Sequence, residues 1–140
     1  MGPSERAQAL GTARLTAALL LAGPFLLMAL FLVVAPREGV VFLVVPAGVL
    51  GLVAPAVAWR VQARIREGAR GDAAGRRRAY LRSLTVGLAI TEAAASVGVV
   101  VWLLTRQPQA LIGLPMHLIM AGALWPSEER LQRAEEEAGG

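Results

Sequence analysis

The hydrophobic residues of the chain fall into four long runs that short polar segments separate. These runs cover residues 15–35, 40–59, 84–104 and 108–125. The runs have 18 to 21 residues, close to the roughly 20 with which a helix crosses a bilayer. The long uninterrupted runs are typical of membrane-spanning helices rather than of the strands or helices of a soluble domain. We therefore predict an all-α protein, residues 1–140 forming one membrane domain, built as a bundle of four antiparallel transmembrane helices.

Proline residues modify the first two predicted spans. The apolar run of the first span is longer than the 7–15-residue apolar h-region of a signal peptide, so we interpret residues 15–35 as a retained helix. Pro24 has no N–H, so the carbonyl of Leu20 loses its helical donor and needs another partner inside the bundle. The second span contains Pro46 and Pro55, which favour a kinked helix over a broken helix that lines a binding site.

The charged residues predict the orientation of the spans. Residues 60–82 contain eight arginines and two acidic residues, and the chain as a whole contains no lysine and no cysteine. Short loops rich in basic residues stay in the cytoplasm. We therefore predict a multi-pass protein of the inner (plasma) membrane with residues 60–82 as a cytoplasmic loop and both termini cytoplasmic. A short cytoplasmic helix over residues 127–137, capped by Ser127, should follow the last span.

The same basic loop predicts an interaction with lipid. Arg76, Arg77 and Arg78 can hold anionic headgroups, at roughly 1 kcal/mol for each basic residue near the surface. Nucleic acid is not expected as a partner, because the loop is tethered between two spans.

The third predicted span carries one carboxylate, Glu92, near its middle. An ionised side chain at that depth costs at least ~2.5–3.5 kcal/mol, so the sequence predicts a carboxyl group that is neutral or poised to change protonation state. Thr85 and Ser96 lie on the same helical face as Glu92. A structural role would have Glu92 donate to a carbonyl freed by a proline, such as that of Leu20 or Gly51. A functional role would make Glu92 a proton or ion carrier.

Small residues recur about every four positions along the third span, beside Glu92. Such a stripe lets a second helix approach closely. The stripe predicts tight helix packing, and it is a surface through which two copies of the chain could associate. Its residues are Ser83, Gly87, Thr91, Ala95 and Gly98.

The segment Gly87-Leu88-Ala89-Ile90-Thr91-Glu92-Ala93, followed by Gly98-Val99-Val100, resembles the second helix of the proteolipid c subunit of rotary ATP synthases. In that family the helix carries the ion-binding carboxylate, so the resemblance implies an ion-carrying role for Glu92. The chain departs from the family in having two further spans and no glycine-rich run in the preceding span. As a whole it resembles small uncharacterised four-span bacterial membrane proteins, a resemblance that implies no activity.

His117 is the chain's one histidine and lies in the fourth predicted span. One histidine supplies only one ligand to a haem, and zinc needs three or four protein ligands, so no cofactor and no metal are expected. At 1.5 Å per residue, His117 and Glu92 both lie about 12 Å from the inner end of their spans. Because sequential helices are usually neighbours, the two side chains could form a neutral hydrogen bond. The alternative has His117 facing lipid headgroups or a carbonyl freed by a proline.

These observations favour a non-enzymatic membrane protein with a structural or accessory role. The chain contains no plausible catalytic triad within the spans and no phosphate-binding loop. The alternative function is translocation of a proton or ion by Glu92.

Overall fold

The structure is a computed structural model that describes residues 3–30, 40–68 and 73–136. The described residues form helices joined by short connections, and they contain no strand. In chain order, the elements are α1 (Pro3–Leu30), η1 (Val41–Leu43), α2 (Val44–Glu67), α3 (Ala73–Thr105), η2 (Pro108–Ile112), α4 (Gly113–Ala123) and α5 (Glu128–Glu136). The all-helical class predicted from the sequence is confirmed.

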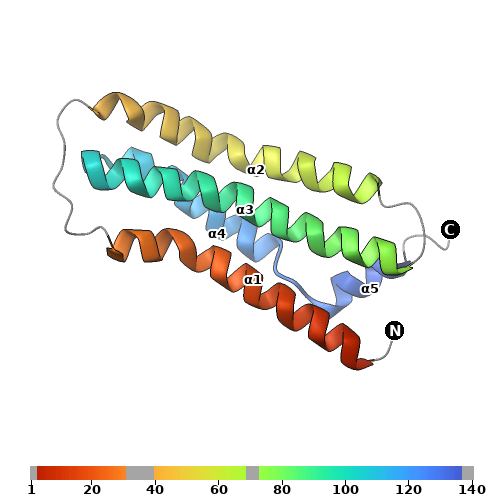
Figure 1. Ribbon diagram of the computed structural model, residues 1–140. Helices are drawn as coiled ribbons and strands as arrows, with labels where there is room; N and C mark the ends of the chain where they lie inside the picture. Colours follow the sequence, from red (N-terminus) through yellow and green to blue (C-terminus); the bar gives the residue numbers. More distant parts are fainter. Residues whose placement is uncertain (1–2, 31–39, 69–72, 137–140) are drawn as a thin grey trace.

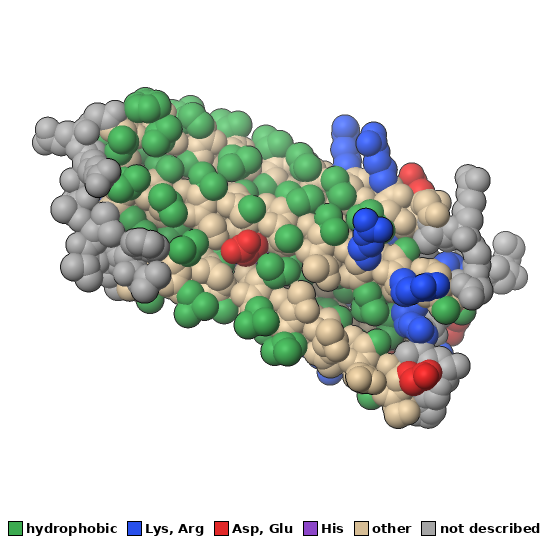
Figure 2. Space-filling view, in the orientation of Figure 1, with side chains coloured by type: hydrophobic (Ala, Val, Ile, Leu, Met, Phe, Trp, Pro, Cys, Tyr) green, Lys and Arg blue, Asp and Glu red, His purple; other side chains and the backbone are tan. Residues whose placement is uncertain are grey.

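Three helical segments are long and apolar enough to cross a membrane: Ser4–Ala29, Val41–Glu67 and Ala73–Thr105. A fourth is obtained if the bent pair Pro108–Ala123 and Glu128–Ala134 counts as one span. On the face seen in the space-filling view, hydrophobic side chains are spread along the helices, and arginines gather at one end (Figure 2). This distribution supports a protein whose sides contact lipid.

Helix α3 is the central element of the molecule. It contacts α1, α2, α4 and α5, and it lies between α1 and α2 in the ribbon view (Figure 1). Its residues supply much of the buried core, which includes Leu84, Leu88 and Val99. A helix surrounded in this way presents apolar or small residues on most of its faces, which explains why its hydrophobic pattern shows no single stripe.

Most of the basic segment over residues 60–82 is helical in the structure. Helix α2 continues through Glu67 and is capped by Gly68, whose N–H donates to the carbonyl of Arg64 at 3.1 Å. Helix α3 begins at Ala73, before the arginine run. Alanine and arginine are strong helix formers, so this charged sequence extends two helices beyond their apolar parts. At 1.5 Å per residue α3 is roughly 50 Å long, more than the ~30 Å of a bilayer core.

The fourth predicted span is built from two kinds of helix. The five 3₁₀ residues of η2 begin at Pro108 and lead into the eleven residues of α4. Together they extend roughly 26 Å, slightly less than a bilayer core. Pro126 has no N–H and disfavours a helical conformation at Trp125, which accounts for the break before α5. The axes on the two sides of this break differ in direction by 71°.

The helix that contains the first predicted span begins before residue 15. Helix α1 starts at Pro3, so the segment before residue 15 is helical, and the helix passes through Pro24 without interruption. Residues 31–35 of that prediction lie outside the described residues.

At the far end of α3, Arg106 adopts a left-handed conformation with a φ of 56°, and its guanidinium lies over the ring of Trp102 at 5.3 Å. This residue ends α3 before the turn to η2.

Candidate functional site

His117 lies at the centre of a polar contact that joins three helices. Its side chain on α4 has no exposed surface. The Nδ1 atom lies 2.9 Å from Oγ1 of Thr91 on α3, and the Nε2 atom lies 3.2 Å from the carbonyl oxygen of Leu20 on α1. The carbonyl that Pro24 deprives of its helical donor therefore obtains a donor from a residue 97 positions away.

The two partners determine the tautomer of a neutral His117. The Leu20 carbonyl can only accept, so Nε2 must carry the proton in that hydrogen bond. Nδ1 is then an acceptor for the hydroxyl of Thr91, whose single proton has a second acceptor in the carbonyl of Leu88, 3.1 Å away on the same helix. Both nitrogens of the uncharged ring thus have a partner inside the bundle. A buried polar group that is fully hydrogen-bonded ties helices together without the cost of an unpaired donor or acceptor.

Glu92 has a different environment, although it adjoins Thr91 on α3. Its side chain is partly buried, and its Oε1 accepts a hydrogen bond of 3.1 Å from Oγ of Ser96, one turn further along the same helix. The carboxylate also lies against Gly23 of α1, where an added Cβ would come within 2.6 Å of Oε1. Glycine at this position leaves space for the carboxyl group between α1 and α3.

The hydrogen bond considered between Glu92 and His117 is not found among the described residues. His117 instead has the alternative partner considered from the sequence, a carbonyl freed by a proline. Thr85, the other possible partner of Glu92, donates to the carbonyl of Leu81 on its own helix at 3.2 Å. Of the groups proposed to surround Glu92, the structure therefore places Ser96 in contact with it.

The small-residue stripe of α3 faces other helices of the same chain. Ser83 and Gly87 lie against α2, where the guanidinium of Arg66 donates to the Ser83 hydroxyl at 3.1 Å and the amide of Gln62 fills the space above Gly87. Further along, Gly98 faces the backbone of Ala110 in η2. All five residues of the stripe are buried: Ser83, Gly87, Thr91, Ala95 and Gly98.

The arginines predicted to bind lipid headgroups separate in the structure. Arg76 lines a cavity at the arginine-rich end of the molecule. Arg77 is partly buried and Arg78 is exposed, and neither lines that cavity. The other arginines of the cavity were not predicted from the sequence, because they come from α2 and α5 and no local motif connects them.

Comparison of the chain with protein-family models, curated proteins and solved structures finds no match. Within the described residues, no cluster of three or more His, Cys, Asp or Glu residues could hold a metal ion. The interior contains a satisfied histidine contact and a carboxyl group bonded within its own helix.

Proposed function

We propose that the chain is an integral membrane protein of four antiparallel spans with a non-enzymatic, structural or accessory role. Its spans would be α1, η1 with α2, the apolar part of α3, and η2 with α4. The arginine-rich end would face the cytoplasm of a cell whose inner membrane holds the protein, following the distribution of basic residues. The length and apolar character of the helices support this proposal.

The observation that carries the proposed role is the environment of His117. This histidine is bonded on both ring nitrogens by helices α1 and α3, so it holds the bundle together instead of extending a proton path toward Glu92. A proton relay normally connects several ionisable groups. Within the described residues Glu92 has Ser96 as its hydrogen-bonding partner, and serine does not change its charge.

Self-association stays a prediction. The stripe on α3 that suggested it is covered by α2, η2 and α4 of the same chain. A second copy would therefore use another surface.

Ion translocation by Glu92 is the competing function, and a flux assay separates the two. The wild-type chain and Glu92→Gln should be reconstituted into liposomes that contain a pH-sensitive dye, with a potassium diffusion potential as the driving force. Glutamine keeps an oxygen that can accept the bond from Ser96 and removes the ionisable proton.

We expect both proteins to give the proton flux of protein-free liposomes. Ser96→Ala serves as a control that alters the same contact without removing the carboxyl group. A flux that is present in the wild type and in Ser96→Ala but lost in Glu92→Gln would contradict the proposed role, and it would assign Glu92 the ion-carrying function that the resemblance to the c subunit implies.

A further inference from the structure

A cavity of about 500 Å³ opens at the arginine-rich end of the molecule, where α2, α3, α4 and α5 meet. One part of its lining is basic and another part is apolar. The lining residues are Trp59, Arg66, Arg76, Ala79, Tyr80, Leu84, Ala123, Leu124, Arg130, Arg133 and Ala134. Four arginines thus line one cavity, and none of the described residues that line it is acidic.

Two of these arginines are held in place by neighbouring groups. Arg66 donates to the hydroxyl of Ser83 at 3.1 Å and to Oε1 of Gln62 at 3.3 Å, and its guanidinium lies 5.6 Å from the centre of the Tyr80 ring. Arg130 donates from Nη1 to the carbonyl of Ala123 at the end of α4. Neither contact neutralises the positive charge, because every partner is uncharged. Both side chains are thus held in place at the cavity with their charge still able to attract an anion.

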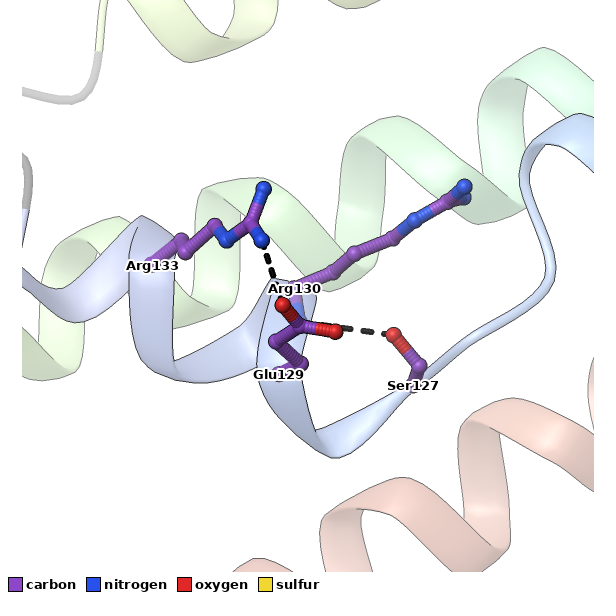
Figure 3. A network of polar contacts seen from close by, with 4 residues as sticks. All are labelled: Ser127, Glu129, Arg130 and Arg133. Carbon is purple, nitrogen blue, oxygen red and sulfur yellow. Dashed lines mark hydrogen bonds and ion pairs between the residues drawn. The ribbon is translucent and has the colours of Figure 1, made fainter.

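The two arginines of α5 are oriented differently. Arg133 turns toward Glu129 and forms an ion pair with it, whereas Arg130 extends away from that carboxylate (Figure 3). Ser127 begins this helix by accepting a hydrogen bond of 3.3 Å from the N–H of Arg130. The capped helix thereby fixes the backbone from which Arg130 projects.

Tyr80 provides an independent indication of a ligand. Its side chain is only 6% exposed and lines the cavity. Its hydroxyl is buried and has no hydrogen-bond partner among the described residues. Buried hydroxyl groups are normally paired, because an unpaired one loses its hydration without compensation. A ligand oxygen in the cavity would supply the missing acceptor.

We propose that this cavity binds the phosphate of an anionic phospholipid headgroup. Arginine suits phosphate because its planar guanidinium can donate two parallel hydrogen bonds to phosphate oxygens. Trp59, Leu84 and Leu124 provide apolar contacts for the lipid near the ends of the proposed spans. The proposal rests on the membrane placement proposed above, and it replaces the run of Arg76, Arg77 and Arg78 by a site assembled from four elements.

The test measures lipid binding by the purified full-length chain in neutral detergent, using native mass spectrometry. The probes are phosphatidylglycerol, phosphatidylcholine and inorganic phosphate. We expect phosphatidylglycerol to bind more tightly than phosphatidylcholine, and inorganic phosphate not to displace it. Tyr80→Phe should weaken phosphatidylglycerol binding by about tenfold or more, because the hydroxyl would donate to a charged phosphate. Arg130→Gln should weaken it by about tenfold or more, because that bond is charge-assisted.

Arg82→Gln is the matched control, since it removes the same charge from an exposed position on α3 that does not line the cavity. It should bind phosphatidylglycerol like the wild type. Tyr80→Phe should melt no lower than the wild type without lipid, because it removes only an unpaired hydroxyl. Equal binding of the two lipids, or wild-type binding by both cavity variants, would overturn the proposal. Displacement of lipid by inorganic phosphate would overturn the lipid assignment. The flux assay is independent of each of these outcomes.

Discussion

At the scale of single residues, the structure resolves a question that Pro24 raises. The sequence predicts that the carbonyl of Leu20 needs a donor, and the structure supplies His117. The need could be derived from the sequence because proline always lacks an N–H. The identity of the donor could not be derived from the sequence, because it depends on how α4 is rotated against α1. Glu92 was an equally suitable candidate by depth, but it bonds to Ser96 instead.

A double-mutant cycle tests this contact. His117→Leu leaves the Leu20 carbonyl unpaired and should lower the free energy of unfolding by about 1–3 kcal/mol. Pro24→Ala restores a backbone N–H that can donate to the same carbonyl. In that background, His117→Leu should cost about 1 kcal/mol less, which thermal or denaturant unfolding in detergent can measure. Strictly additive losses would show that the histidine does not serve the carbonyl freed by Pro24.

At the scale of elements, the apolar runs predict where helices exist but not where they end. The runs underestimate α3, because hydropathy marks the apolar part of a helix while alanine and arginine extend it. The break after α4 is consistent with Pro126, whereas the 3₁₀ conformation of η2 has no signal in the hydrophobic pattern. The cavity could not be predicted from the sequence, because its residues come together only when α5 packs beside α3.

Close packing between elements can be tested at two glycines. An added Cβ at Gly51 of α2 would lie 2.6 Å from backbone atoms of Gly113 in α4, and backbone cannot move aside as a flexible side chain can. Gly51→Ala should therefore lower the free energy of unfolding by about 1–3 kcal/mol. Gly122→Ala is the control, because nothing lies within 4 Å of its added Cβ. It should leave stability unchanged or raise it by about 0.4–1 kcal/mol. Equal melting temperatures for the two variants would refute this packing.

At the scale of the whole molecule, the contacts bring the polar ends of the helices together. The guanidinium of Arg14, in the first half of α1, donates to the carbonyl of Pro126 at 3.2 Å, beside the start of α5. Arg66 near the end of α2 and Arg130 of α5 line the same cavity. The beginning of α1, the end of α2 and α5 thus lie at one end of the molecule (Figure 1). This arrangement supports the four-span topology, in which η2 and α4 return the chain to the side where it began.

The central claim, four crossings with both termini in the cytoplasm, depends on whether the short segment Pro108–Ala123 crosses the membrane. Reporter fusions that are active on only one side of the membrane measure this directly. Fusions placed after residue 70 and after residue 140 should both report a cytoplasmic location, with a fusion after residue 106 reporting the opposite side. A cytoplasmic signal at residue 70 together with a non-cytoplasmic signal at residue 140 would mean three crossings, and it would contradict the proposed fold.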